Sequence, residues 1–261
     1  MIQLVTFADQ SMSNSARLCI QSAAEHGVDL PRWVQWEQFK LTTFYAEHKQ
    51  LFDQPRGLGY WAWKPWVILE SMKTARDGDV VIYSDAGVEI IADVNEVVKR
   101  MDQDIHLFAN QWQHAHWCKR DVIESICSPS IMMSSRNRST RAAVFERDGL
   151  RWEFFDKQCQ ASVIFFCVSD YSKQFVSEWL DWCLIPHLID DSPSIAPNHP
   201  EFREHRHDQA ILTTLAYREG LHLHWWPARY NDGAFDYPKG EFTDDYPVMF
   251  HHHRRRNELA A

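Results

Sequence analysis

Apolar residues in the first part of the chain follow two spacings, one typical of buried strands and one typical of helices. Ile2 to Ala8 is apolar enough for a buried strand, and the next segment, SMSNSARLCIQSAAEHG, has helical spacing and ends at Gly27. Trp33 to Phe39 indicates a second strand. Trp61 to Arg76 has apolar residues at a helical period, and Pro65 suits its first turn. The chain therefore begins as strand, helix, strand and helix.

The same alternation continues through most of the sequence. Further strands are expected at Val80 to Tyr83, Ile105 to Ala109, Ala161 to Val168 and in the segment LHLHWW, and further helices at Val94 to Met101, Cys118 to Ile126, Tyr171 to Leu184 and His205 to Arg218. Strands that alternate with helices favour a mostly parallel sheet with helices on both faces. We predict an α/β fold in one domain, residues 1–229, followed by a tail, residues 230–261.

Composition narrows the classes of function. With 261 residues, 45% of them hydrophobic, the chain can bury a sizeable core. Its formal net charge of -9 makes nucleic acid an unlikely partner, because general affinity for phosphates comes from clustered Lys and Arg. The sequence has neither a long apolar run nor a signal peptide, so we expect a cytoplasmic protein without a membrane span. The six cysteines form no CxxC pair and are expected to be reduced thiols in the core.

Asp85 is the first candidate for chemistry, because it stands two positions after the end of the predicted strand from Val80 to Tyr83. A carboxylate at the end of a buried strand is costly to desolvate unless it meets a cation, a metal or hydrogen-bond donors. Ligands of open α/β sheets bind outside the carboxyl ends of the strands, and a carboxylate there can hold a divalent cation together with substrate phosphates. The alternative is that Asp85 only caps a turn before Gly87.

Four motifs occur in order along the chain: VTFAD at the end of the first strand, GYWxWKP, GDxxxYxDAG around Asp85, and HRHDQ at the start of a late helix. In this combination the sequence resembles nucleotide-sugar glycosyltransferases of the GT-A fold, especially small bacterial and viral enzymes of polysaccharide synthesis. It resembles more distantly the retaining transferases of the glycogenin and lipooligosaccharide galactosyltransferase type. The resemblance implies a hexosyltransferase with a UDP-sugar donor, a glycan acceptor, and Mn²⁺ or Mg²⁺ as cofactor.

The resemblance also implies which residues hold the donor. The residues expected to bind the nucleotide sugar are Thr6, Phe7, Ala8, Asp9, Lys64, Asp85 and Ala86. Among them, Lys64 matches the basic position that reaches the donor sugar and the diphosphate. Two of these residues have plain structural alternatives. Asp9 could cap the first helix, and Lys64 could extend past the aromatic faces of Trp61, Trp63 and Trp66.

For the metal, the resemblance matches Asp85 to the first acid of the DxD motif, but Gly87 stands where the second acid is expected. A histidine of the tail would then complete the site, and His251 and His253 are the candidates, with His252 between them. Imidazole suits manganese better than magnesium. Arg254 and the two arginines after it could clamp the diphosphate. The alternative is that this part of the tail is a solvated basic segment. In the transferase reading, the tail completes the donor and metal site.

The HRHDQ motif supplies the remaining catalytic candidates. By resemblance to retaining transferases, Asp208 would bind sugar hydroxyls and Gln209 would lie near the anomeric carbon, while the leaving phosphate accepts the acceptor proton. Asp208 could instead pair with Arg206 or cap the helix. An inverting reaction would need a carboxylate base, for which Asp121 and Asp208 are the candidates. Trp117 could stack on an acceptor sugar or simply precede a helix.

Two other classes of function remain open from the sequence. A metal-dependent nucleotide or phosphate hydrolase could use an acid and histidines without any sugar, although the chain lacks a GxxxxGK[ST] loop. A sugar-binding module without catalysis would agree with the 12 tryptophans. Metal-dependent nucleotide binding would distinguish the transferase from the binding module, and hydrolysis without transfer would indicate the hydrolase.

Overall fold

The main sheet has six strands in the order β2-β1-β3-β8-β5-β9. The structure is a computed structural model that describes residues 1–128, 144–146, 149–230 and 235–253. The strands are β1 (Ile2–Ala8), β2 (Leu30–Gln35), β3 (Val80–Ser84), β5 (Ile105–Gln113), β8 (Lys157–Cys167) and β9 (Leu223–Trp225). Only β8 runs against its neighbours β3 and β5, so the sheet is mostly parallel. The predicted α/β fold class is confirmed.

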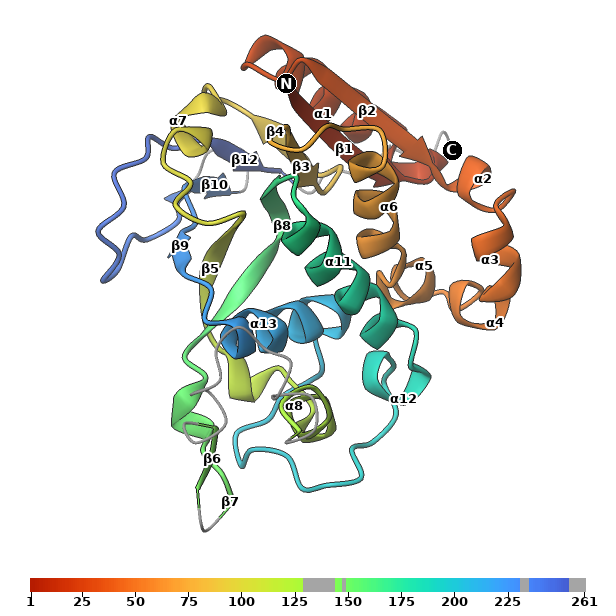
Figure 1. Cartoon of the computed structure of the whole chain (residues 1–261), viewed down its shortest axis with the longest axis vertical. Coiled ribbons are helices and arrows are strands. Elements are labelled where there is room, and N and C mark those ends of the chain that lie inside the picture. Colours follow the sequence, from red (N-terminus) through yellow and green to blue (C-terminus); the bar gives the residue numbers. More distant parts are fainter. Residues whose placement is uncertain (129–143, 147–148, 231–234, 254–261) are drawn as a thin grey trace.

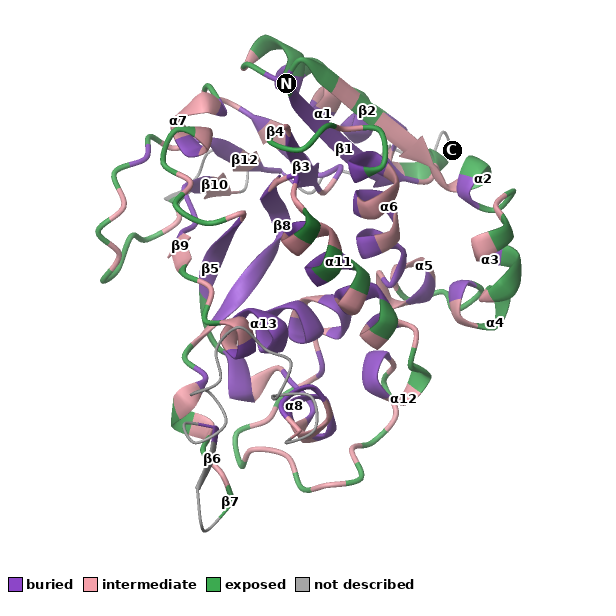
Figure 2. Ribbon diagram, viewed as in Figure 1, coloured by how far each residue is buried: buried purple, intermediate pink, exposed green. Residues whose placement is uncertain are grey.

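Helices cover both faces of this sheet (Figure 1). The longer ones are α1 (Ser13–Glu25), α6 (Trp63–Met72), α11 (Asp170–Cys183) and α13 (His207–Glu219), with α8 (Arg120–Ile126) beside α13. Successive side chains of a strand point to opposite faces. On β1, Val5 and Phe7 accordingly pack toward α6, α11 and α13, while Leu4 packs toward Cys19 of α1. The central strands are buried on both faces (Figure 2), which explains their unbroken apolar runs.

A second, smaller sheet joins the tail to the domain. Its order is β11 (Phe235–Asp236), β10 (Ala228–Tyr230), β12 (Phe250–His252) and β4 (Val88–Ile90). The ring of Phe250 is fully buried and stacks on Trp226 with centroids 4.9 Å apart. The strand β12 lies between β10 and β4, and β4 follows the Asp85 turn directly. This part of the tail is therefore integrated into the fold.

The segment between β2 and α6 differs from the prediction. The strand expected at Trp33 to Phe39 begins earlier, at Leu30, and ends at Gln35. Trp36–Phe39 forms the short helix α2, because Gln35 and Gln38 make a capping box. Three more short helices follow: α3 (Thr43–Glu47), α4 (Lys49–Phe52) and α5 (Gly57–Tyr60). The aromatic rings of α3 and α4 converge on the buried Phe39. The helix expected at Val94 to Met101 is reduced to α7 (Asn95–Val98).

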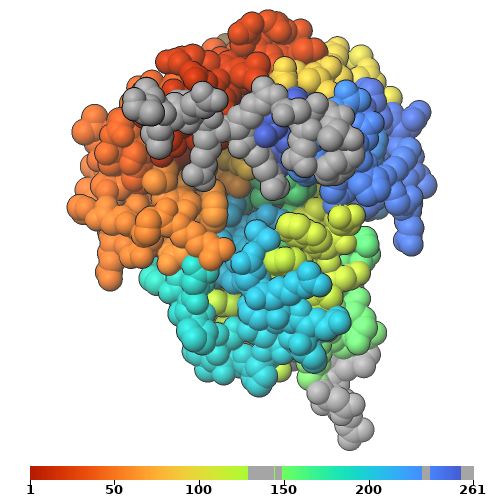
Figure 3. All heavy atoms as spheres, turned by 180° about the vertical axis from the view of Figure 1, so that it is seen from behind, coloured from red at the N-terminus to blue at the C-terminus, as the bar shows by residue number. Residues whose placement is uncertain are grey.

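The loop of residues 190–206 crosses the surface on the side shown in Figure 3 (cyan). It begins after α12 (Pro186–Ile189), and Asp121 of α8 holds it by accepting backbone N–H bonds from Ile195 at 2.7 Å and Ala196 at 2.9 Å. Asp121 also contacts His187 at 2.7 Å. Its carboxylate, a candidate base in the sequence, is thus occupied in anchoring this loop.

The remaining elements are small. They are the 3-10 helices η1 (Gln10–Met12), η2 (His114–His116) and η3 (Trp152–Phe154), and the hairpin of β6 (Phe145–Glu146) and β7 (Gly149–Leu150). All six cysteines are free thiols, and five of them are buried, as expected. Within the described ranges, every helix is too short or too polar to cross a membrane.

Candidate active site

Lys64 lies at the centre of the candidate site, where the carboxyl ends of β1 and β3 meet the first turn of α13. Its ammonium group is almost fully buried and lies 3.0 Å from Asp208 Oδ2 and 3.6 Å from Asp85 Oδ1. It also donates a hydrogen bond to the carbonyl of Ala161 at 3.0 Å. Asp85 accepts a further hydrogen bond from Tyr83 Oη at 2.6 Å. Three of the sequence motifs therefore meet at one cation.

Burial and charge act against each other on these groups. Burial disfavours the charged form of Lys64, but Asp208 and Asp85 outweigh this effect and raise the pKa of the ammonium above its usual value. Burial raises the pKa of Asp208 to about 6, although Lys64 acts in the opposite direction. Burial, reinforced by the charge of Asp85, also raises the pKa of Tyr83. Shifted ionisable groups that converge at one edge of a sheet are typical of functional sites.

Two histidines and a tryptophan fix the backbone that carries Asp208. His205 Nε2 lies 2.8 Å from the carbonyl of Leu188, and His207 Nδ1 lies 2.7 Å from that of Ile189. Burial lowers the pKa of both histidines, so each is neutral and donates its ring N–H to the carbonyl. On the other side, the indole N–H of Trp179 donates to the carbonyl of Asp208 at 3.0 Å.

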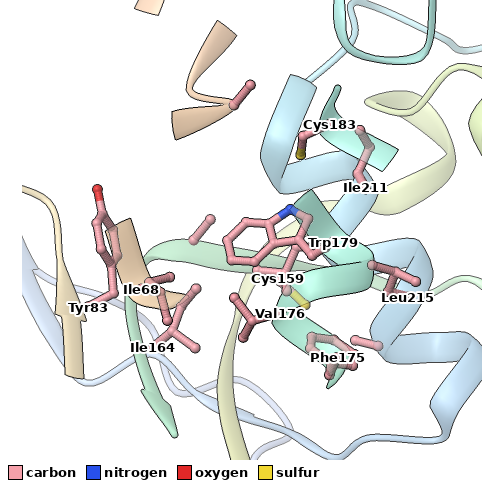
Figure 4. Close-up of a cluster of buried hydrophobic side chains, with 14 of the residues drawn as sticks. Ile68, Tyr83, Cys159, Ile164, Phe175, Val176, Trp179, Cys183, Ile211 and Leu215 are labelled. Carbon is pink, nitrogen blue, oxygen red and sulfur yellow. The ribbon is translucent and has the colours of Figure 1, made fainter. Parts of the chain in front are cut away.

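Trp179 itself lies at the centre of a packed apolar cluster with side chains from α6, α11, α13 and β8 (Figure 4). Its side chain is fully buried, and Cys183, one turn along α11, is buried beside it. Side chains in a close-packed core have little freedom to shift. The position of Asp208 is thus set by the core rather than by a loose loop.

The Gly-rich aromatic turn brings Lys64 to this place. Leu58, Tyr60 and Trp61 all have positive φ, as does Gly59 at +91°, so the chain turns sharply just before α6 begins. The rings of Tyr60 and Trp61 then lie 5.1 and 5.6 Å from that of His207. Backbone strain of this kind in residues with side chains is uncommon and persists where surrounding packing holds it. The turn packs directly on the segment that leads into Asp208.

The predicted nucleoside-binding residues end β1, beside the Asp85 turn. Ala8 and Ala86 belong to one small buried cluster, so the two predicted segments are neighbours. Thr6 is fully buried, and the ring of Phe7 stacks on Trp63 with centroids 3.9 Å apart. These two side chains lie within the core. Asp9 caps the 3-10 turn η1, which precedes α1, by accepting from Ser11 N at 3.0 Å, while Met12 stands at the N-cap of α1 itself.

The tail histidines lie next to the same turn. The pairing of β12 with β4 sets His251 opposite Glu89, and the backbone N–H of His253 donates to the carbonyl of Gly87 at 3.1 Å. The rings of His251 and His253 are 5.8 Å apart. His252 alternates to the other side of the strand, where it is buried with its ring 5.0 Å from that of Tyr230. His251 and His253 therefore share one side of β12. Arg254 lies outside the described residues.

The surroundings of His251 fit a metal ligand. Its Nδ1 lies 3.0 Å from Glu89 Oε2, while its buried Nε2 makes no hydrogen bond within the described part of the chain. Histidines that bind metals commonly donate their other ring N–H to a carboxylate in this way. The Asp85 side chain is 34% exposed and can accept a cation from solvent. Asp85, His251 and His253 do not form a ready-made cluster of three ligands, so phosphates and waters would have to complete the coordination.

Gln209 and Trp117 have protein partners. Gln209 is partly buried and its amide donates to Gln158 Oε1 of β8 at 2.9 Å, so it lies against the sheet next to Asp208. Trp117 stacks on Trp112 with centroids 4.7 Å apart, and the guanidinium of Arg206 lies 4.5 Å from the Trp117 ring. Trp112 remains partly exposed at the end of β5.

Tyr83, Gln158 and Glu89 are site residues without a predicted role, although Tyr83 belongs to the motif GDxxxYxDAG. Tyr83 stands two positions before Asp85, and its hydroxyl contacts the Asp85 carboxylate. That spacing was the available signal, since alternate residues of a strand share a face. Glu89 and Gln158 carry no signal in the sequence, because their roles arise from pairing with β12 and α13.

Comparison with known proteins gives likenesses in fold only. No protein-family model matches the sequence. No curated protein matches it either. Mouse xyloside xylosyltransferase 1, in its apo form, is similar over 97% of both chains, with 13% sequence identity and a TM-score of 0.45. The apo structure of the bifunctional glycosyltransferase WbbM is similar over 92% of this chain and 41% of its own, with 13% identity and a TM-score of 0.42. These likenesses are loose, and the functional proposal is based on the geometry of the site.

Proposed function

We propose that this chain is a glycosyltransferase that moves a sugar from a nucleoside diphosphate donor, UDP-linked, to a hydroxyl group of a glycan. The observation that carries the proposal is the buried Lys64 ammonium between Asp208 and Asp85 at the carboxyl edge of a mostly parallel sheet. Ligands of open α/β sheets bind at this edge. A structural ion pair alone gives no reason for a second carboxylate, one-third exposed, at the same cation.

Charge balance supports a cationic cofactor beside Asp85. Two carboxylates face one ammonium, so the group carries a net negative charge when all three are ionised. A divalent cation held by Asp85 with His251 or His253 would balance this charge. When bound, Mn²⁺ or Mg²⁺ supplies Lewis-acid stabilisation to the departing diphosphate. Lys64 would then pair mainly with Asp208 and add fixed positive charge near the donor.

The protein residues have distinct roles in this proposal. Ala8 and Ala86 form the small-residue floor on which the nucleoside lies, and Lys64 faces the diphosphate and the donor sugar. Asp208 accepts hydrogen bonds from sugar hydroxyls, and its rigid backbone fixes their position. Gln209 lies near the anomeric carbon and stabilises the positive charge that develops there.

Retention of configuration is part of the proposal. An inverting transferase needs a general base for the acceptor hydroxyl. The Asp121 carboxylate already accepts from Ile195, Ala196 and His187, and Asp208 is paired with Lys64. Asp121 is thus occupied, and in this proposal Asp208 accepts from sugar hydroxyls while it pairs with Lys64, so neither carboxylate is assigned as the base for the acceptor. In a retaining reaction the leaving phosphate oxygen takes the acceptor proton.

Thermal unfolding with nucleotides tests the proposal. We expect UDP with Mn²⁺ to raise Tm and a chelator to abolish the shift, since a ligand at 100 times its Kd adds about 2.7 kcal/mol of stability. Asp85→Asn should lose the Mn²⁺-dependent shift, whereas Asp102→Asn, an exposed acid away from the site, should keep it. GDP, CMP and dTDP identify the base preference.

Other outcomes would redirect the assignment. Absence of any nucleotide shift would contradict a donor site and favour a sugar-binding module. Fast hydrolysis of the nucleotide with no transfer to any glycan would indicate a hydrolase. Transfer from a UDP-sugar, with the anomeric configuration of the product read by NMR, would separate retention from inversion.

A further inference from the structure

A second group of possible metal ligands lies away from Lys64. His116 belongs to η2 at the end of β5, while His199 and Glu201 belong to the loop of residues 190–206. One ligand atom from each of the three lies within 4.8 Å of the other two. Among the residues that the structure describes, no other three acids, histidines or cysteines are so close.

We propose that His116, His199 and Glu201 bind a transition-metal ion of the zinc type, with water in the fourth position. Imidazole and carboxylate ligands suit Zn²⁺ and its neighbours rather than Mg²⁺. Three protein ligands plus a water form the usual open zinc site. The proposal uses none of the residues assigned to the donor and therefore stands independently of the proposed function.

The geometry is close to what such an ion requires. His116 Nε2 lies 3.0 Å from Glu201 Oε2, and the two imidazole rings have centroids 5.0 Å apart. Bond lengths of about 2.0–2.1 Å in a tetrahedron place ligand atoms roughly 3.4 Å from one another. A separation at the 4.8 Å limit would therefore have to shrink by about 1.4 Å. The Glu201 side chain is 71% exposed, so it can change its distance to either histidine at little cost.

Metal binding would change one hydrogen bond of His199. In the structure the Glu201 N–H donates to His199 Nδ1 at 3.1 Å. Coordination through Nε2 moves the ring proton to Nδ1 and exchanges this hydrogen bond for the metal bond.

There is room for the ion and for water. All three residues line a cavity of about 400 Å³ that is open to solvent. Glu153 and Asp156 line the same cavity and add negative charge around the ion. Trp152 forms an apolar wall, and its ring lies 5.3 Å from that of His199.

The site would link the loop to the sheet. Two backbone hydrogen bonds already join these segments, from Arg203 N to the carbonyl of His116 at 2.8 Å and from Arg206 N to that of Trp117 at 3.0 Å. The same side of the molecule is visible in Figure 3, where the loop (cyan) lies against the segment that follows β5. Because this loop leads directly into Asp208, the ion would stabilise the approach to the candidate active site.

Metal titration of the full-length protein tests the inference. Chelator-treated protein is titrated with ZnCl₂ by calorimetry and with CoCl₂ by visible absorption, both without nucleotide. We expect one tight site, a Co²⁺ spectrum typical of four-coordination, and a higher Tm with Zn²⁺. His116→Ala, His199→Ala and the conservative Glu201→Gln should each weaken Zn²⁺ binding by more than about 10-fold.

Two controls separate this site from other histidines. His222→Ala removes an exposed histidine, and His253→Ala removes a candidate ligand of the donor-site metal. Both variants should keep the Zn²⁺ affinity of the wild type. Equal affinity in wild type and in the His116, His199 and Glu201 variants would overturn the inference, as would loss of binding only in His253→Ala. Circular dichroism of each apo variant checks that it is folded.

Discussion

At the scale of single residues, the buried ammonium group of Lys64 depends on two acids, Asp85 and Asp208, which balance its charge. Removing one partner of a buried ion pair leaves an uncompensated charge, which costs about 3–5 kcal/mol. We predict a loss of this order in the free energy of unfolding for Lys64→Met, measured by urea denaturation. The double variant Lys64→Met/Asp208→Asn should recover part of it.

Lys173→Met is the matched control for that measurement. Lys173 also pairs with an acid, Asp77 at 2.8 Å, but the pair is exposed. Its removal should leave the free energy of unfolding nearly unchanged. Similar losses in Lys64→Met and Lys173→Met would contradict a buried, charge-compensated site.

Asp208 should make the stability depend on pH. Its pKa is about 6 in the folded protein against an ordinary 3.8, so between these values the folded state holds a proton that the unfolded chain has released. The stability from this group is complete below pH 3.8 and is lost as the pH rises through about 6. The total is up to about 3 kcal/mol.

The comparison of wild type with Asp208→Asn isolates this contribution. Carboxylates whose pKa is lowered in the folded protein, such as Asp190 and Asp244, act in the opposite direction. The stability that they contribute to the folded state is lost as the pH falls. The difference between the two urea-unfolding curves should therefore slope with pH only between about 4 and 6. Parallel curves throughout would show that Asp208 titrates normally.

At the scale of elements, the turn before α6 depends on glycine at one position. Gly59 has φ +91°, and a Cβ there would lie 2.8 Å from Phe52 Cδ1 and 2.9 Å from Phe52 Cα. Gly78 has a similar φ of +86° with open space around it. Both alanine variants meet the cost of a left-handed conformation, about 1–2 kcal/mol, but only Gly59→Ala adds a clash of about 1–3 kcal/mol.

The pair of variants separates these two effects. We expect Gly59→Ala to lower Tm clearly more than Gly78→Ala in thermal unfolding. It should also weaken nucleotide binding, because the same turn positions Lys64 and supports His207. Equal Tm values would mean that the chain relaxes around Phe52 without cost.

The strand β12 holds the tail in place through Phe250. The ring is fully buried against Trp226 and Phe108, so Phe250→Ala should cost about 3–5 kcal/mol in urea denaturation. Phe242, which is only partly buried at the edge of the same cluster, provides the control. A smaller loss in Phe250→Ala than in Phe242→Ala would contradict the integration of the tail into the domain.

At the scale of the whole molecule, the sequence predicts best what is buried on both faces. The strand Ile2 to Ala8 has the predicted bounds, because all seven of its residues are buried and the apolar run is continuous. The expected strand Trp33 to Phe39 was wrong at both ends: β2 begins at Leu30, and a short helix that also buries Phe39 follows Gln35. No hydrophobic pattern in the sequence predicts the small sheet, because its strands are at most three residues long and pair with segments far away in the sequence.

The candidate site, too, was predicted from the sequence only in part. The resemblance placed Lys64, Asp85 and Asp208 together, and the structure brings these three side chains into contact. Periodicity alone gives no means of joining them, because the contact depends on how α6, β3 and α13 pack. Their assignment as catalytic and donor-binding residues remains a prediction for the nucleotide and variant experiments.

The pairing of β4 with β12 has a consequence for protein synthesis. His251 and Glu89, which contact each other, are 162 positions apart in sequence. Contacts between such distant segments form late, and chains fold from the N-terminus as they leave the ribosome. The Asp85 turn is therefore synthesised early, and it lacks the neighbouring strand β12 until residue 252 has left the ribosome. A ribosome that stalls before that point would carry a nascent chain in which β4 has no β12 to pair with.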